Sequence, residues 1–216
     1  MENQYSEIKL EVEEFLTKFE NDENQNNAYK KYFRGIQIFF TPLIHKPKFM
    51  FIGINPGAGY FNNEGKQTNY VKRFSPMKKT EYVGQEYRLA KETRKLFELA
   101  KIKKNYLQNS VKTNYYFLAT KNTNDLDKLL NSLQNYNIEK KSEKWINKLT
   151  EIIEPEFIIC EGKSIFEKFT KTKVSENDVV YYAEIGKLKV IGYKRKFSNI
   201  VNKKKVAELL EEKLSE

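Results

Sequence analysis

The stretch Phe49-Met50-Phe51-Ile52-Gly53-Ile54-Asn55-Pro56-Gly57-Ala58-Gly59 decides the fold class of this chain. It is an apolar run that ends in a turn rich in Gly and Pro. Continuous apolar runs are typical of strands in a buried parallel sheet, and open α/β sheets bind ligands beyond the carboxyl ends of such strands. Pro56 restricts the backbone after Asn55, while Gly57 and Gly59 permit left-handed dihedral angles or a close backbone approach. The stretch therefore predicts a strand that presents the Asn55 amide at a ligand cleft.

Apolar and polar segments alternate along the rest of the chain. This alternation predicts an α/β fold, specifically a three-layer α/β/α domain with a central, mainly parallel sheet of about four strands. We expect a helical extension at 1–27 and the α/β domain at 28–216. Spacing of apolar residues predicts helices at 5–20, 84–101, 122–153, 163–170 and 202–214, and strands at 49–53, 111–119, 156–160, 179–183 and 187–192. The last two strands form either a hairpin around Gly186 or one interrupted strand.

Three segments resemble the uracil-DNA glycosylase superfamily and occur in that family's order. Gly53-Ile54-Asn55-Pro56-Gly57 matches the first motif of the mismatch-specific or single-strand-selective-like branch. Lys112-Thr113-Asn114-Tyr115-Tyr116-Phe117 is similar to the second strand, and the segment 157–166 is similar to the third strand, its Gly turn and the following helix. The resemblance covers residues 48–212. It implies the fold of that family and hydrolysis of the N-glycosidic bond of uracil or a related damaged base in DNA, a repair reaction that uses base flipping.

The resemblance also implies roles for individual residues. In the mismatch-specific branch, the Asn at the position of Asn55 orients the attacking water. Asn114 is expected to read the edge of uracil, because an amide offers both a donor and an acceptor; the alternative is a strand-end Asn that closes a turn. Tyr60 or Phe61 is expected to stack on the flipped base. The expected substrate-binding residues are Gly53, Ile54, Pro56, Gly57, Tyr60, Phe61 and Asn114.

The chain departs from the family pattern after its last strand. The family has His-Pro-Ser or Asn-Pro-Ser there, whereas this chain reads Gly192-Tyr193-Lys194-Arg195-Lys196-Phe197-Ser198-Asn199, in which Ser198 is the matching residue. Lys194 or Arg195 would then stabilise the departing base; alternatively, the three consecutive cations Lys194, Arg195 and Lys196 would hold the DNA backbone, or would only cover a surface loop. The expected catalytic residues are Asn55, Lys194, Arg195 and Ser198. Two alternatives remain open: a catalytically impaired nucleic-acid-binding protein of the same fold, and a small-molecule protein that holds an anion at the turn 53–59.

The charge balance favours a polyanionic partner. The chain has 39 Lys and Arg residues against 29 Asp and Glu residues, which gives a net charge of +10. Phosphate contacts with release of counterions would use this excess, although charge runs are also typical of solvated surface. We expect damaged or uracil-containing DNA as the partner, no membrane, and a cytoplasmic monomer. The absence of an apolar run near the roughly 18 residues of a membrane span supports that expectation.

Other kinds of site find no support in the sequence. Cys160 is the single cysteine, so the chain has no internal disulfide and no Cys cluster for zinc or an iron–sulfur group. We expect no metal and no cofactor, with Cys160 as a core residue and His45 as a surface residue. The glycines from Gly57 to Gly65 fit neither the spacing of a P-loop nor that of the dinucleotide-binding fingerprint.

Overall fold

The computed structural model describes residues 2–22, 31–57, 60–61, 67–68 and 70–216, and it describes the backbone alone for 2, 60, 61, 67, 68 and 81. The chain folds into two compact units, each made of three segments. Unit 1 consists of Met1–Phe39, Asn55–Pro76 and Asn114–Ile152. Unit 2 consists of Phe40–Ile54, Met77–Thr113 and Ile153–Glu216. The expected domain boundary between residues 27 and 28 falls outside the described residues.

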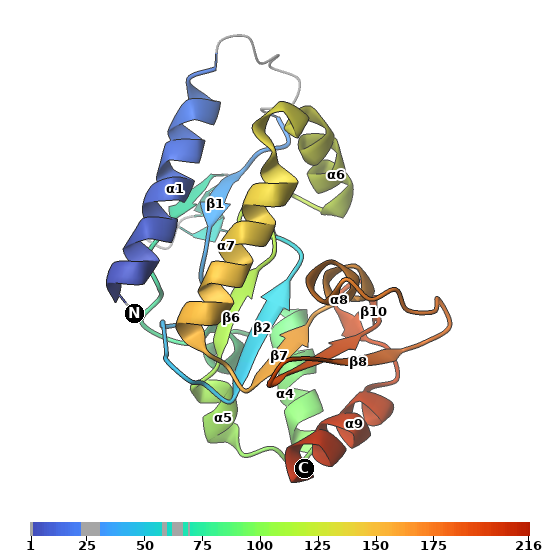
Figure 1. Cartoon of the computed structure of the whole chain (residues 1–216). Helices are drawn as coiled ribbons and strands as arrows, with labels where there is room; N and C mark the ends of the chain where they lie inside the picture. The colour runs from blue at the N-terminus through green and yellow to red at the C-terminus, as the bar shows by residue number, and fades with distance from the viewer. Residues whose placement is uncertain (1, 23–30, 58–59, 62–66, 69) are drawn as a thin grey trace. The chain divides into compact units, whose positions relative to one another are not determined.

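Unit 2 is built on a sheet of five strands in the order β6-β2-β7-β9-β8 (Figure 1). The strands are β2 (Phe49–Gly53), β6 (Val111–Asn114, whose last residue belongs to unit 1), β7 (Phe157–Cys160), β8 (Val180–Ile185) and β9 (Leu188–Tyr193). The pairs β2–β7 and β7–β9 are parallel, and β8 is antiparallel to β9. The chain is therefore an α/β protein with a mixed, mostly parallel sheet of five strands, where about four were predicted. The hairpin around Gly186 is confirmed, and this Gly has a φ of 61°.

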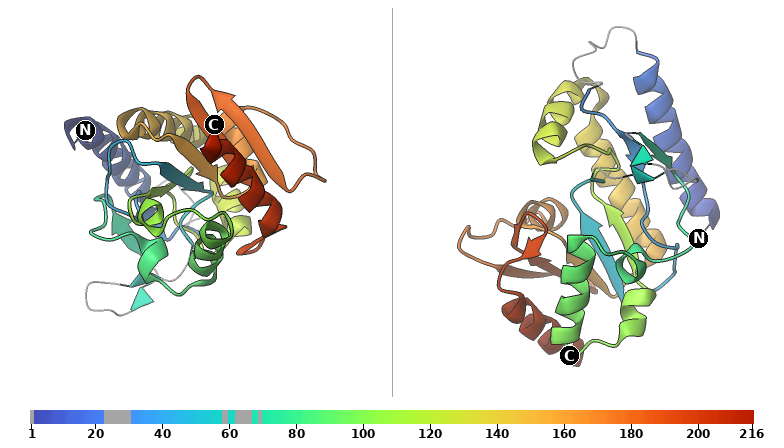
Figure 2. Two further views of the ribbon diagram at one scale, coloured as in Figure 1. Left: turned by 90° about the horizontal axis from the view of Figure 1, so that it is seen from below. Right: turned by 180° about the vertical axis from the view of Figure 1, so that it is seen from behind.

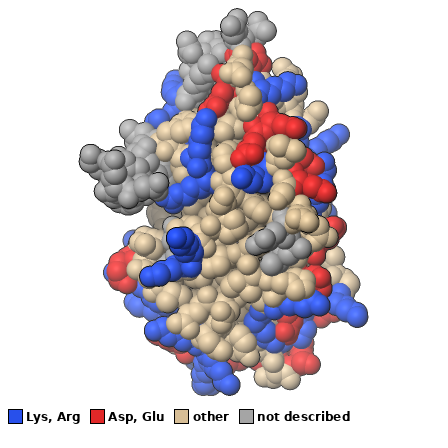
Figure 3. All heavy atoms as spheres, turned by 90° about the vertical axis from the view of Figure 1, so that its left-hand side faces the viewer, with Lys and Arg blue, Asp and Glu red and all other residues tan. Residues whose placement is uncertain are grey.

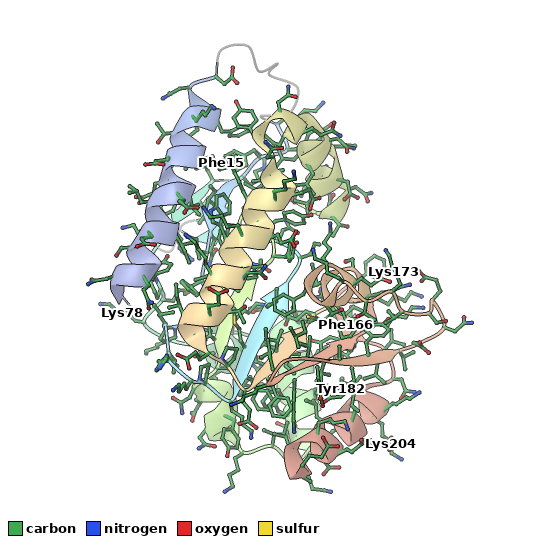
Figure 4. The ribbon with its side chains drawn as sticks, in the orientation of Figure 1. Phe15, Lys78, Phe166, Lys173, Tyr182 and Lys204 are labelled. Atoms are coloured by element: carbon green, nitrogen blue, oxygen red, sulfur yellow. The ribbon has the colours of Figure 1, made fainter. Side chains whose placement is uncertain are left out.

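Helices pack on this sheet through aromatic and aliphatic side chains. They are α3 (Glu81–Gly84), α4 (Arg88–Leu99), α5 (Lys104–Gln108), α8 (Lys163–Thr170) and α9 (Lys203–Ser215). Phe97 of α4 lies with its ring centroid 5.1 Å from that of Phe49, and Leu210 of α9 belongs to the same buried cluster. Helices α4 and α9 lie side by side (Figure 2). Phe166 of α8 packs on β9 (Figure 4), where a Cβ at Gly192 would lie 2.8 Å from the Cβ of Phe166. Gly192 therefore permits the close approach of α8.

Unit 1 contains α1 (Glu2–Glu20), β1 (Gly35–Gln37), β3 (Tyr60–Phe61), β4 (Gln67–Thr68), β5 (Val71–Arg73), α6 (Thr123–Ser132), the 3-10 turn η1 (Gln134–Tyr136) and α7 (Ile138–Ile153, whose last residue belongs to unit 2). α1 lies beside α7, with Phe15 between them (Figures 1 and 4). The ring of Phe15 lies 5.9 Å from Trp145 and 6.0 Å from Tyr136, centroid to centroid. The helical region predicted at 122–153 is interrupted at Asn137, whose φ of 52° is left-handed.

The strand predicted at 111–119 was wrong beyond Asn114. The buried residues that follow leave the sheet and pair with β1: the Gln37 N–H donates to the Phe117 carbonyl at 3.0 Å, and the Ala119 N–H to the Gly35 carbonyl at 2.8 Å. Gly35 has a φ of 98°, and a Cβ there would lie 1.8 Å from the Val71 carbonyl oxygen of β5. An apolar run of this kind does not distinguish one continuous strand from two shorter pairings, because both bury the same side chains.

Charged side chains are interspersed on the face in Figure 3. Lys and Arg there are separated by uncharged surface and by Asp and Glu, so this face carries no continuous basic patch over the described residues. None of the described helices is long and apolar enough to cross a membrane.

Candidate functional site

Asn55 follows the carboxyl end of β2, as the sequence predicts, and it belongs to unit 1, where its amide bonds to other residues of the same unit. Nδ2 donates to the Pro56 carbonyl at 2.9 Å, to Thr120 Oγ1 at 2.8 Å and, more weakly, to the Leu118 carbonyl at 3.4 Å. The Thr120 N–H donates in turn to the Pro56 carbonyl at 3.2 Å. These bonds join the turn after β2 to the segment that follows Asn114.

The hydrogen bonds fix which end of the Asn55 amide is its NH₂ group. The Thr120 hydroxyl donates to the Asn122 carbonyl at 2.7 Å, so its oxygen acts as an acceptor toward Asn55. Two carbonyls and this oxygen surround one end of the amide, and only the NH₂ group satisfies all three. No group among the described residues donates to Asn55 Oδ1. Oδ1 is therefore the atom that is left to accept a hydrogen bond from water or a ligand.

Asn114 is the last residue of β6 and is only 3% exposed. Its Nδ2 is buried and has no hydrogen-bond partner among the described residues. A buried donor without a partner costs about 1–3 kcal/mol, so such groups are rare in native proteins. The other two buried side-chain atoms of this kind in the described part of the chain are Ser142 Oγ and Tyr193 OH.

The turn around Asn55 differs in one respect from the prediction. Gly53 and Pro56 are buried, Ile54 is half-buried and Gly57 is exposed. The left-handed conformation permitted at Gly57 is not used, because its φ is not positive, and open space surrounds the position of a Cβ there. Gly59 and the side chains of Tyr60 and Phe61 lie outside the described residues, so the predicted stacking role stays a prediction.

Lys194, Arg195 and Ser198 lie in unit 2, in and next to a short hairpin of β10 (Arg195–Lys196) and β11 (Asn199–Ile200). Lys194 Nζ donates to the Glu176 carbonyl at 2.7 Å. Arg195 donates through Nη1 to the Glu161 carbonyl and through Nε to the Phe197 carbonyl, each at 3.1 Å. Ser198 is half-buried. Both cations singled out from the sequence are therefore bound to backbone oxygens.

The tip of the same hairpin carries Phe197, which is 86% exposed and has a φ of 57°. A left-handed conformation is uncommon for a residue with a side chain, and a Phe in it is worth a functional explanation. Lys196 beside it is also exposed.

Sequence reasoning also missed a buried polar cluster in unit 2. The Glu161 carboxylate, directly after β7, lies 2.5 Å from Lys112 Nζ and accepts a hydrogen bond from Tyr82 OH. Glu161 is 3% exposed, Lys112 is 5% exposed and Tyr82 is fully buried. Two features of the sequence could have indicated this cluster: a Lys within the apolar segment 111–119, and a Glu directly after an apolar strand. Cys160, the residue before Glu161, is fully buried as predicted, and burial raises the pKa of its thiol.

Unit 1 also contains a groove. It has a volume of about 620 Å³ and lies between α1, η1 and α7, with Glu11, Glu14, Lys18, Asn135 and Lys141 among its lining residues. Glu11 is neutralised there by Lys144 and Lys148, at 2.9 and 3.1 Å. The groove contains none of the predicted site residues.

No protein-family model matches the chain, and a search of curated proteins finds no relative. Within the described ranges, no group of three or more His, Cys, Asp or Glu side chains is placed to hold a metal ion.

Proposed function

We propose that this protein is a DNA glycosylase with a three-layer fold of the uracil-DNA glycosylase type, which removes uracil or a related damaged base. The observation that carries the proposal is the fixed amide of Asn55. Three acceptors hold Nδ2, so Oδ1 is directed away from them. An oxygen fixed in this way suits the orientation of a water molecule for attack on the glycosidic carbon, the role that the resemblance implies for Asn55.

The proposed chemistry relies on positioning and on stabilisation of the leaving base. An amide does not deprotonate water at neutral pH, so Asn55 contributes orientation rather than general-base catalysis. Bond breaking must then be assisted by donors that face the developing negative charge on the base. Loss of one preorganised donor of this kind typically costs about 3 kcal/mol, or roughly 10²–10³ in rate. Lys194, Arg195 and Ser198 are the candidates that the sequence supplies for such a donor.

Asn114 suits the reading of the base. Its unpartnered Nδ2 would donate to a carbonyl oxygen of uracil, which satisfies the buried donor when substrate is bound. Because Asn114 is 3% exposed, the base reaches it only when the atoms above it move aside. We therefore propose that the base pocket opens on binding.

We propose that the tip of the β10–β11 hairpin, with Lys196 and Phe197, contacts DNA. Phe197 is an exposed aromatic side chain, and aromatic or apolar side chains enter or stack on base steps in many nucleic-acid complexes. Lys196 next to it is exposed and suits a phosphate contact. The net charge of +10 supports the same class of partner.

A cleavage assay with uracil-containing oligonucleotides, single- and double-stranded, tests the proposal. The expected result is an abasic site that alkali cleaves, formed by the wild-type protein and not by Asn55→Ala, with both proteins equally folded and equally able to bind DNA. A fully active Asn55→Ala protein would show that the motif is structural. Matched oligonucleotides with thymine in place of uracil control for nuclease contamination.

A second candidate is a nucleic-acid-binding protein of the same fold without glycosylase activity. It is favoured by the hydrogen bonds of Lys194 and Arg195, which direct both cations to backbone carbonyls. Under this reading the protein binds DNA with strong salt dependence and leaves every base in place. DNA binding without cleavage of any uracil substrate would select this candidate.

A further inference from the structure

The Glu161 side chain is the centre of a buried, charge-compensated network. Its carboxylate contacts Lys112 Nζ at 2.5 Å and accepts from Tyr82 OH. Lys112 Nζ also lies over the Tyr82 ring, 4.6 Å from its centroid. The Glu161 N–H donates to the Ile52 carbonyl of β2 at 2.9 Å. Side chain and backbone of Glu161 are thus both fixed at the carboxyl end of β7.

The charge of Glu161 is retained despite its burial. Burial acts to raise the pKa of the Glu161 carboxyl, but the Lys112 ammonium, the Arg195 guanidinium and the hydrogen bonds from Lys112 and Tyr82 hold this pKa below its ordinary value. Breaking a buried ion pair by removing one partner leaves an uncompensated charge and is strongly unfavourable. The contacts of Glu161 with Lys112 and Tyr82 therefore form an anchor: they hold Glu161 in place, and with it any side chain that bonds to its backbone carbonyl.

Arg195 connects this anchor to the hairpin tip. Nη1 binds the Glu161 carbonyl and Nε binds the Phe197 carbonyl, each at 3.1 Å, so one guanidinium joins the end of β7 to the tip of its own hairpin. The base of the hairpin is held separately. There the Val201 N–H donates to the Lys194 carbonyl at 2.9 Å, and the Lys194 N–H donates to the Val179 carbonyl at 2.8 Å. The left-handed Phe197 is therefore constrained from both sides.

We infer that Arg195 is a positioning residue: anchored on Glu161, its guanidinium holds the hairpin tip so that Lys196 and Phe197 project toward nucleic acid. The inference rests on the proposed function only for the identity of the partner. Arg suits this task because its planar group directs two donors at fixed angles, whereas Lys has a single ammonium on a flexible stem. Arg195 then contributes to DNA binding through the hairpin and not by contact with a phosphate.

The substitution Arg195→Lys tests the inference because it keeps the charge and removes the two-donor geometry. Hydrogen exchange of residues 194–201 in the free protein should become about 10-fold faster or more. Affinity for undamaged DNA should fall about as far as in Phe197→Ala, with the salt slope of binding unchanged. The inference would be overturned if Arg195→Lys had the hydrogen exchange and the DNA affinity of the wild type while Arg195→Met lowered the salt slope of binding by about one. That pair of results would show that Arg195 contacts a phosphate.

Lys196→Ala is the matched control, because it removes an adjacent exposed cation and leaves both bonds of Arg195 intact. Its exchange at residues 194–201 should equal that of the wild type.

The anchor is tested with Lys112→Met/Glu161→Met, which removes both charges together and so avoids an unpaired buried ion. We expect faster exchange at 194–201 in the double variant, and unchanged exchange would overturn the role of the network. The exchange measurements need no DNA. Absence of DNA binding by the wild-type protein would therefore overturn the proposed function, while the positioning role of Arg195 would still be decided by exchange.

Discussion

Asn55 Nδ2 and Thr120 Oγ1 lie 2.8 Å apart although 65 residues separate them in sequence. Because the Thr120 hydroxyl donates to the Asn122 carbonyl, its oxygen accepts from Nδ2 and fixes the amide with Oδ1 directed away from these acceptors. Thr120→Val removes this acceptor and should slow single-turnover uracil excision about five-fold, which corresponds to the roughly 1 kcal/mol of one hydrogen bond. Thr120→Ser keeps the hydroxyl and should be nearly as active as wild type. Equal rates for the Val and Ser variants would show that Thr120 does not orient Asn55.

Asn114→Leu should separate stability from activity. The substitution removes a buried donor that has no partner among the described residues and replaces the amide with a side chain of similar size. We expect a free energy of unfolding equal to wild type or up to about 1 kcal/mol higher, because no unsatisfied group remains. Excision should fall by at least 100-fold, since the reading of uracil is lost. Denaturant unfolding and a single-turnover assay measure the two effects, and a large loss of stability would indicate a structural role.

Lys196→Ala and Phe197→Ala should weaken DNA binding in different ways. Removal of one phosphate contact lowers the slope of log affinity against log salt by about one. Loss of a stacking side chain costs about 1–3 kcal/mol, or roughly 5- to 150-fold in affinity, and leaves the salt slope unchanged. Fluorescence anisotropy at several salt concentrations distinguishes the two. Lys204→Ala is the control, because this side chain is 86% exposed on α9 (Figure 4). An identical decrease in all three variants would show that the hairpin tip is not a specific contact.

The Lys112–Glu161 pair should make stability dependent on pH in the acid range. The pKa of Glu161 in the folded protein is below its ordinary value, so its contribution to stability is complete above the unfolded pKa of about 4.3 and is lost as pH falls through the lower folded value. Lys112→Met/Glu161→Met lacks this contribution. Its free energy of unfolding should therefore decrease less than that of the wild type between about pH 6 and about pH 3. Parallel curves would show that the pKa of Glu161 is the same in the folded and the unfolded protein, and a smaller decrease for the wild type than for the double variant would show that its folded pKa is raised.

Gly192→Ala should destabilise unit 2. The added methyl would lie 2.8 Å from Phe166 Cβ, a contact that requires α8 to move away from β9. Overpacking of this size costs about 1–3 kcal/mol. Gly84→Ala is the matched control, because the position of its Cβ has nothing within 4 Å. Denaturant unfolding should show a loss of stability for Gly192→Ala alone, and equal stability of the two variants would contradict the close packing.

Local patterns in the sequence were sufficient for most elements of the fold. The apolar run before Asn55 became β2, the segment 163–170 became α8, and the hairpin around Gly186 formed, because burial and turn chemistry are encoded within a few neighbouring residues. The presence of Asn55 directly beyond a buried strand was predictable for the same reason.

Long-range pairing was decided only in the tertiary structure. The residues after Asn114 pair with β1 instead of extending β6, since sequence patterns specify burial but not the partner that provides it.

For the side chains of the candidate site, too, the sequence predicted one part and the tertiary structure decided the other. The residue types at Asn55 and Asn114 were apparent from the sequence, whereas the direction of the Asn55 amide depends on a hydroxyl 65 residues away. The contacts of Glu161 and Arg195 were equally unpredictable from the sequence, because a buried ion pair and a guanidinium bound to two carbonyls form only when distant segments are brought together. Hydrogen-bond geometry is set by three-dimensional contacts, and these are what the tertiary structure added.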